Sequence, residues 1–352
     1  MHRITRRTVI AQLAAGALGR TLVCTLGGFA HCSSSPRAFA EDFAVSRLPR
    51  EVWVGTVCQH GLQADTSEEM LDLMLDRMEH MIPQRPDIIC LPEMFHVAYV
   101  RGPRKPISET SEVPIGRFSQ PFAEFAKQHR CYVVCPISTV ENGRYYNSAV
   151  VIDRDGRLVG EYRKINPTVN ELDKGIAPGP VDPPVFELDF GKIGIQICYD
   201  INWHENWRRL SEKGAEIVFW PSAFAGGRML NALAWINKYY IVSSTRIQAS
   251  KIVDVLGDEI ATTGRFATWI CQPINLDVAV VQTHRNIAKL DEVAKKYGRA
   301  INIKVQHVEA WARLESRSSE VTVTDVLKEF GLETARQMFA RETKLQDAAR
   351  AK

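Results

Sequence analysis

The hydrophobic positions between residues 50 and 285 follow two different periods along the chain. Short apolar runs rich in Val and Ile predict buried strands, and apolar residues three and four positions apart predict amphipathic helices. One helix begins with a capping box, in which Thr66 is followed by Glu69, and runs to about residue 81. Strands that alternate with helices and are interrupted by hairpins predict an α/β fold. The predicted strands are 52–57, 86–91, 132–137, 146–152, 158–162, 193–197, 216–220, 241–246, 250–255, 269–276 and 278–282, and the other helices are 118–129, 203–213 and 229–240.

The stretch 191–205, GKIGIQICYDINWHE, places a cysteine where a predicted strand gives way to a helix. Such a bend exposes the side chain and leaves it close to free backbone N–H groups at the start of the helix. Because these groups and the helix dipole favour negative charge, we expect Cys198 to favour the thiolate. The alternative is one more buried core cysteine, which is the commoner role for this residue type.

Two further ionisable residues follow predicted strands. Glu93 comes directly after strand 86–91 and Pro92, and carboxylates at strand ends in α/β folds line the active cleft. Lys164 ends a predicted hairpin and precedes the Pro- and Gly-rich loop 166–184, which also carries Glu171. The alternatives are a surface glutamate and a solvated lysine.

The three residues lie in distinctive local sequences, which are LPEMF for Glu93, YRKINP for Lys164 and ICYDINWHE for Cys198. Taken together, these sequences resemble the three signatures of the nitrilase superfamily of carbon–nitrogen hydrolases, in the same order. The resemblance covers roughly residues 52–277. It implies a four-layer α-β-β-α sandwich, with two sheets between outer helices. Members of this superfamily commonly pair through those helices, so we expect a homodimer or a higher homo-oligomer.

The resemblance also implies a mechanism for cleaving an amide. Glu93 would act as general base toward Cys198, whose sulfur would form a thioester with the substrate. Lys164 and the backbone N–H of Tyr199 would stabilise the oxyanion, and Glu171 would orient the lysine or water. This chemistry requires neither a metal nor an organic cofactor. We expect substitutions at these residues to change stability little, because a strand-end cluster in an open cleft has few core contacts.

Departures from the superfamily pattern bear on the substrate. Asn166 stands where many members have histidine, and segment 201–203 lacks the arginine that holds a substrate carboxylate in carbamoyl amino-acid hydrolases. We therefore expect a neutral or bulkier linear amide, contacted by Phe95, Asn202 and Trp203. Tyr199 and Asp200, in place of Trp-Glu, favour an amidase over a nitrilase. The alternatives are an N-carbamoyl amide hydrolase, a nitrilase, an acyltransferase, or an exported binding protein that has lost catalysis.

The first forty residues predict an export signal. A pair of arginines precedes the mildly apolar run 9–29, and Ala38-Phe39-Ala40 is a small-x-small cleavage site. This pattern resembles a twin-arginine signal, which predicts a periplasmic protein cleaved after Ala40. An uncleaved membrane anchor is the alternative. No later run has the ~20 apolar residues that a spanning helix needs.

Composition and charge narrow the classes of partner. The 352 residues are 45% hydrophobic and 24% charged, as in ordinary globular proteins. The net charge is +3, but the first forty residues hold five arginines and no acid, so the rest carries −2 and gives no reason to expect nucleic acid. The cysteine spacing completes no zinc site. We divide the chain into the signal 1–40, a hydrolase domain 41–285 and a charged, mostly helical extension 286–352 with one long helix at 333–351.

Overall fold

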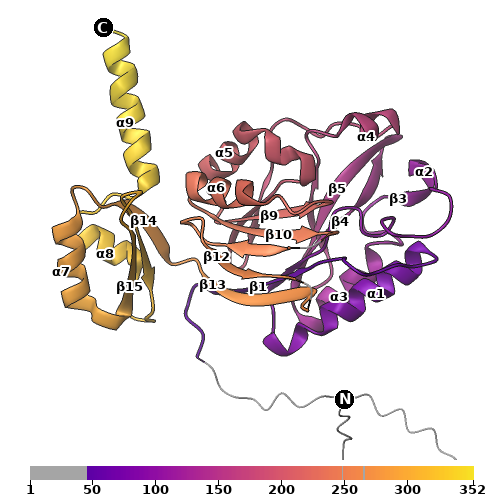
Figure 1. Ribbon diagram of the computed structural model, residues 1–352, viewed down its shortest axis with the longest axis horizontal. Coiled ribbons are helices and arrows are strands. Elements are labelled where there is room, and N and C mark those ends of the chain that lie inside the picture. Colours follow the sequence, from indigo (N-terminus) through magenta and orange to yellow (C-terminus); the bar gives the residue numbers. More distant parts are fainter. Residues whose placement is uncertain (1–45, 248, 265) are drawn as a thin grey trace, which may run out of the picture. The chain divides into compact units, whose positions relative to one another are not determined.

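The computed structural model describes residues 46–352 apart from 248 and 265 (Figure 1). Its two larger sheets have the strand orders β13-β1-β2-β4-β5-β6, with β3 beside β4, and β12-β11-β10-β9-β8-β7. The first comprises β1 (Glu51–Val57), β2 (Ile88–Cys90), β3 (Ser111–Glu112), β4 (Tyr132–Glu141), β5 (Arg144–Ile152), β6 (Leu158–Arg163) and β13 (Trp269–Asn275). The second comprises β7 (Val185–Leu188), β8 (Gly191–Ile195), β9 (Ile217–Ser222), β10 (Tyr240–Thr245), β11 (Lys251–Val253) and β12 (Glu259–Thr262).

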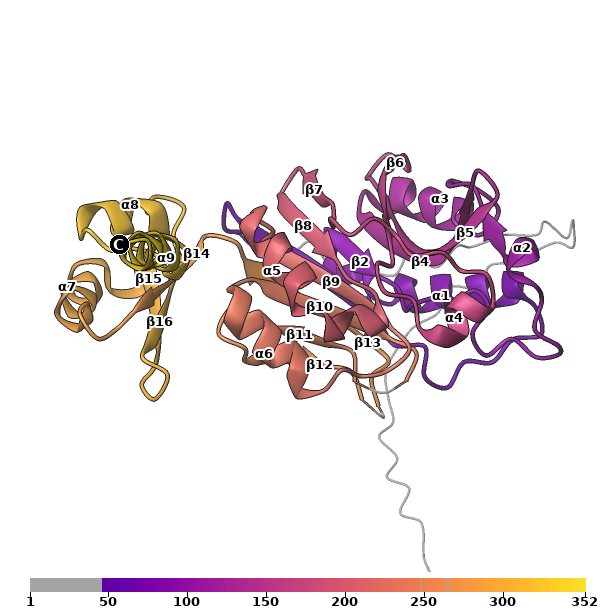
Figure 2. The ribbon, with the colours of Figure 1, turned by 90° about the horizontal axis from the view of Figure 1, so that it is seen from above.

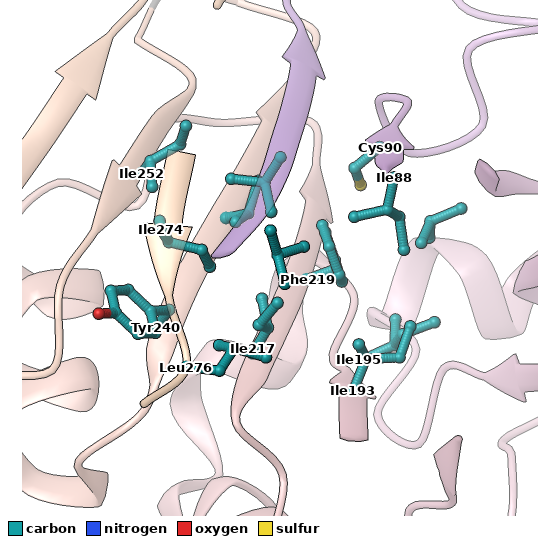
Figure 3. Packing of buried hydrophobic residues seen from close by; sticks show 14 of the residues in the cluster. Ile88, Cys90, Ile193, Ile195, Ile217, Phe219, Tyr240, Ile252, Ile274 and Leu276 are labelled. Carbon is teal, nitrogen blue, oxygen red and sulfur yellow. The ribbon is translucent and has the colours of Figure 1, made fainter. Parts of the chain in front are cut away.

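The two sheets pack face to face over a shared apolar core (Figure 3). Ile88 and Cys90 of β2 belong to this core, together with Ile193 and Ile195 of β8. Ile89, between the first two, belongs to a different cluster on the helix side of its sheet. Because successive side chains of a strand point to opposite faces, the short apolar runs are buried on both sides, which is why they read as continuous rather than alternating.

Helices cover the outer face of each sheet. Helices α1 (Ser67–Glu79) and α3 (Gln120–His129) pack on the first sheet, and α5 (His204–Glu212) and α6 (Arg228–Asn237) pack on the second (Figure 2). The four-layer α-β-β-α sandwich expected from the sequence is therefore confirmed. Two short helices, α2 (Ile107–Thr110) and α4 (Val169–Asp173), lie in the loops after β2 and β6.

The C-terminal segment folds around a small antiparallel sheet of its own, in the order β14-β16-β15. Its strands are β14 (Val278–Gln282), β15 (Ile301–Gln306) and β16 (Trp311–Ser316), and its helices are α7 (Ile287–Tyr297), α8 (Val323–Glu329) and α9 (Ala335–Arg350). The three helices agree with a helical extension, and α9 matches the long helix predicted at 333–351. Strands β15 and β16 were not expected, and β14 pairs with β16 instead of closing the main body. We call residues 278–352 the C-terminal module.

The predicted signal segment 1–40 lies outside the described residues. Within the part of the chain that the structure does describe, no helix combines the length and the apolar character that crossing a membrane requires.

Candidate active site

Cys198 lies on a tight bend after β8, at the first residue of a 3₁₀-helix, Cys198–Asn202. Its φ of 47° falls in the left-handed region, which costs energy for a residue with a side chain. Two buried indoles hold the bend: Trp220 Nε1 donates to the carbonyl of Cys198 at 3.1 Å, and Trp207 Nε1 donates to that of Asp200 at 3.0 Å. The surrounding core thus fixes the cysteine in a conformation that the local sequence alone disfavours.

The carboxylate of Asp200 ties this bend to the neighbouring sheet. It accepts hydrogen bonds from the Ile197 backbone N–H at 3.0 Å and from the Tyr162 hydroxyl of β6 at 2.7 Å. It also accepts from the backbone and side chain of Asn166, at 2.8 and 2.9 Å. Asn166, noted in the sequence only as a departure from the superfamily pattern, therefore helps to fix the cysteine bend.

The expectation of an exposed sulfur that favours the thiolate is wrong. Cys198 is only 8% exposed, and helix α5 begins six residues later, so no α-helix start lies beside the thiol. Burial raises the pKa of Cys198, and the charge of Glu93 raises it further, while Lys164 acts in the opposite direction; the result is a pKa of about 12. The resting site therefore holds a neutral thiol.

The structure brings Glu93, Lys164 and Glu171 together in one hydrogen-bonded cluster. Lys164 Nζ donates to Glu93 Oε1 at 2.9 Å and to the two carboxylate oxygens of Glu171 at 3.0 and 2.8 Å. Asn147 of β5 bridges the two acids, because its Nδ2 lies 2.8 Å from Glu93 Oε1 and 2.7 Å from Glu171 Oε1. Glu171 is held in turn by a capping box with Thr168 at the start of α4.

Burial and charge fix the protonation states of this cluster. Burial raises the pKa of Glu93, but the charges of Lys164 and Arg246 and hydrogen bonds from Lys164 and Asn147 lower it by more, to about 2. Burial lowers the pKa of Lys164, and the charges of Glu93 and Glu171 raise it above its ordinary value. An ionised Glu93 and a protonated Lys164 therefore stand near a neutral Cys198.

Lys164 and Glu93 are buried, in contrast to the open strand-end cleft expected from the sequence. Removing one member of a buried ion pair leaves the other charge without a partner in a low-dielectric environment. The burial removes the reason for expecting substitutions here to change stability little, and we predict instead that they destabilise the protein.

The two oxygens of the Glu93 carboxylate have different surroundings. Oε1 accepts from both Lys164 and Asn147. No hydrogen bond from another described residue reaches Oε2, and Arg246 Nη2 lies 3.8 Å from it. Oε2 is thus the oxygen that remains available to accept a proton.

Arg246 and Asn147 are the functional neighbours that sequence reasoning missed. Arg246 stands just past the end of β10 and donates from Nε to the Glu93 carbonyl at 2.5 Å. The rule that led to Glu93, an ionisable side chain directly after a buried strand, applies equally to Arg246. Asn147 is a buried polar residue in strand β5, directly before Ser148 and an apolar run, and a polar pair inside a predicted buried strand was the available signal.

The three candidate substrate contacts differ in their positions. Phe95 is fully buried on the helix side of the first sheet, edge-on to Phe122 with ring centroids 5.2 Å apart, so its assignment as a substrate contact is wrong. Trp203 is 40% exposed and packs against Tyr199, with ring centroids 5.2 Å apart. Asn202 is also exposed and donates to the Tyr199 carbonyl at 3.0 Å.

Among residues 46–352, omitting 248 and 265, no group of three or more His, Cys, Asp or Glu side chains is arranged to hold a metal ion. The six cysteines of this part are free and buried.

Comparison with known proteins identifies the class of enzyme. The family model described as carbon-nitrogen hydrolase matches residues 56–286, which is most of the sandwich and extends just past β14. The chain belongs to the carbon–nitrogen hydrolase family. This hydrolase is 29% identical to a beta-ureidopropionase of Arabidopsis thaliana over 233 residues, which are 60% of this chain and 56% of the relative. It is also 29% identical to a nitrilase of Pyrococcus abyssi over 50% of this chain and 68% of that protein.

Solved structures agree on the fold. An amidase from Nesterenkonia sp. superposes with a TM-score of 0.57 at 20% identity, covering 64% of this chain and 90% of the amidase. The hydrolase spans little more than half the length of the plant relative, and the relatives bear three different activity names. The comparisons therefore establish the carbon–nitrogen hydrolase family and the fold without naming the substrate.

Proposed function

We propose that this hydrolase cleaves a linear, non-peptide amide to an acid plus ammonia or an amine, through a thioester on Cys198. The proposal rests on a buried Cys198 thiol, whose pKa burial raises, and on an ionised Glu93, one of whose carboxylate oxygens accepts no hydrogen bond from any residue that the structure describes. That combination is typical of a cysteine that a general base deprotonates as the sulfur attacks, rather than of a cysteine that is a thiolate at rest.

In the acylation half, Glu93 Oε2 takes the proton of Cys198 while the sulfur forms a bond to the amide carbon. The proton moves as the bond forms, because the thiol is far too weak an acid to ionise beforehand beside Glu93. The negative charge that develops on the carbonyl oxygen faces the Lys164 ammonium and the Tyr199 backbone N–H. Collapse of the intermediate breaks the carbon–nitrogen bond, and Glu93 returns its proton to the departing nitrogen.

In the deacylation half, water replaces the amine. Glu93, ionised again, removes a proton from water as its oxygen attacks the thioester carbon. The carbon–sulfur bond breaks, the proton returns to the sulfur, and the acid leaves. Glu171 shares the Lys164 ammonium with Glu93 and keeps it fixed through both halves. Every step uses side-chain and backbone groups of this chain together with water.

A second candidate substrate class is the N-carbamoyl amino acids. Segment 201–203 offers no positive charge to a carboxylate, which favours uncharged amides. Arg246, however, places a partly exposed guanidinium beside Glu93, and its only described hydrogen bond is the one from Nε to the Glu93 carbonyl. Its remaining N–H groups are suited to a substrate carboxylate. Nitriles, acyl transfer to an amine, and binding without catalysis are the further alternatives.

A hydrolysis screen tests the proposal. Purified protein is incubated with aliphatic and aryl amides, N-carbamoyl amino acids and nitriles, and the release of ammonia or amine is measured. We expect the uncharged amides to react fastest and Cys198→Ala to abolish their turnover. Cys271→Ala, which removes another buried cysteine, is the matched control and should keep its activity. A more than tenfold preference for N-carbamoyl amino acids, about 1.4 kcal/mol of transition-state binding, would favour the second candidate.

We also propose that residues 1–40 direct export to the periplasm, with cleavage after Ala40, and that the mature protein is a homodimer or a higher homo-oligomer. The arginine pair and the cleavage motif support the first proposal. The resemblance to the nitrilase superfamily supports the second.

A further inference from the structure

The segment that carries Lys164 and the bend that carries Cys198 come from different sheets. Lys164 directly follows β6 of the first sheet, whereas the bend follows β8 of the second. Lys164 and Cys198 shift each other's pKa, which places the two side chains near one another. In the proposed mechanism, on which this inference rests, the Lys164 ammonium and the Tyr199 backbone N–H act on one carbonyl oxygen. The two segments must therefore keep a fixed spacing.

Asn166 joins these two segments. Its backbone N–H and its Nδ2 donate to Asp200 Oδ1, at 2.8 and 2.9 Å. Asn166 stands two residues after Lys164, and Asp200 stands two residues after Cys198. Asn166 is half-buried and Asp200 is fully buried, so water competes little for these hydrogen bonds. A carboxylate is also a stronger acceptor than a neutral oxygen.

Asp200 is held equally firmly through its second oxygen. Oδ2 accepts from the Ile197 backbone N–H at 3.0 Å and from the Tyr162 hydroxyl at 2.7 Å. Each oxygen of this buried carboxylate therefore accepts two hydrogen bonds. Because the contact with Ile197 lies within the bend, a change at Asn166 should loosen the segment that carries Lys164 rather than the bend itself.

We propose that Asn166 is a positioning residue for hydrolysis, which sets the spacing between the Lys164 ammonium and the Tyr199 backbone N–H by tying their segments together. Loss of the hydrogen bond from Nδ2 would allow Lys164 to move relative to that N–H. A displacement of about 1 Å at a catalytic site can cost roughly 10²-fold in rate, even when the mutation lies away from the chemistry. Asn166 thus acts on the reaction through Asp200.

Steady-state kinetics of Asn166→Leu test this role, because leucine has a similar size and lacks the donor. With the uncharged amide that reacts fastest in the hydrolysis screen, we expect kcat to fall at least about tenfold and KM to change less than about threefold. Cys198 should still react with methyl methanethiolsulfonate within about threefold of the wild-type rate, because this reagent is attacked at sulfur and forms no oxyanion. Asn302→Leu, at a half-buried position on β15, is the matched control and should keep the wild-type kcat.

An exchange of donor and acceptor shows whether the contact with Asp200 is responsible. Asn166→Asp sets two carboxylates against each other and should lower kcat at least as much as Asn166→Leu. Adding Asp200→Asn allows the amide at position 200 to donate to the carboxylate at position 166, so the double variant should be faster than Asn166→Asp alone. Thermal melts confirm that each variant is folded.

Three results would each overturn the positioning role: a wild-type kcat in folded Asn166→Leu, an equal loss of Cys198 reactivity toward methyl methanethiolsulfonate, or a double variant no faster than Asn166→Asp. Failure of the wild-type protein to turn over any amide would instead refute the proposed function, and this role with it.

Discussion

Lys164 Nζ lies 2.9 Å from Glu93 Oε1, with only 1% and 4% of the two side chains exposed. An ion pair this deeply buried gives up the hydration of both charges, and their mutual attraction must compensate for that loss. The pair therefore links the chemistry of the site to the stability of the sandwich. It also makes the consequence of a substitution depend on which charges remain.

We predict that Lys164→Met destabilises the protein by about 3–5 kcal/mol, because it leaves the buried Glu93 and the half-buried Glu171 without their cation. The double variant Lys164→Met with Glu93→Gln removes one of those orphaned charges and should regain part of the loss. Urea unfolding measures both. Lys192→Met, which removes an exposed lysine 4.0 Å from Glu187, should cost less than about 1 kcal/mol. Equal losses for the Lys164 and Lys192 variants would contradict the buried-pair argument.

A second prediction concerns the ionisation of Cys198. The wild-type thiol should show almost no thiolate below about pH 10, because burial and the Glu93 charge raise its pKa to about 12. Glu93→Gln removes a charge that raises this pKa and should lower it, whereas Lys164→Met removes a charge that lowers it and should raise it. The measurement is the ultraviolet absorbance of the thiolate against pH, with Cys198→Ala subtracted. A thiolate step centred below pH 8 in the wild type would refute the neutral resting thiol.

Asn147→Asp tests the bridge between the two acids. It replaces a donor to Glu93 and Glu171 with a further carboxylate, so the pKa of Glu93 should rise from about 2. We expect the acid limb of the pH profile of kcat/KM to move upward. Asn302→Asp on β15 adds the same charge away from the cluster and should leave the profile unchanged. If the acid limb of the pH profile does not move in Asn147→Asp, then Asn147 does not influence the ionisation of Glu93.

The export proposal is tested on protein isolated from the periplasm of a bacterial host. Sequencing should give Glu41 as the first residue, because Ala38-Phe39-Ala40 is the cleavage motif. Replacing both Arg6 and Arg7 with lysine should leave uncleaved precursor in the cytoplasm, whereas replacing Arg20, outside the pair, should not. Periplasmic protein that retains its intact N-terminus would rule out the cleavage.

The sequence was sufficient to single out Glu93, Lys164 and Cys198, but not Asn147 or Arg246, which also contact Glu93. Glu93, Lys164 and Cys198 each follow a buried strand, and the carboxyl ends of neighbouring strands in a layered α/β fold face the same region. Their burial was not predictable, because it depends on how the two sheets and the loop carrying Glu171 close over one another. The pKa of Cys198 follows from that closure, and no local pattern around the cysteine encodes it.

Other differences have equally specific causes. Phe95 is two residues from Glu93, yet it lies in the core beneath α3 because the turn after β2 sends the two side chains to opposite sides. In 301–306, Ile301, Ile303 and Val305 alternate as a strand should, but the charged helical segments around them dominated the prediction. Pairing of β14 with β16 joins segments about thirty residues apart, and short-range periodicity does not report such pairing.

The thioester on Cys198 is the central claim, and trapping it is the most direct test. Protein turning over its best amide substrate is quenched in acid and digested, and the peptide that carries Cys198 is examined by mass spectrometry. We predict that this peptide gains the mass of the acyl group, that hydroxylamine removes the gain, and that Cys198→Ala shows neither the adduct nor turnover, while Cys271→Ala shows both. Continued turnover by folded Cys198→Ala, or an acyl group found only on another residue, would contradict the account.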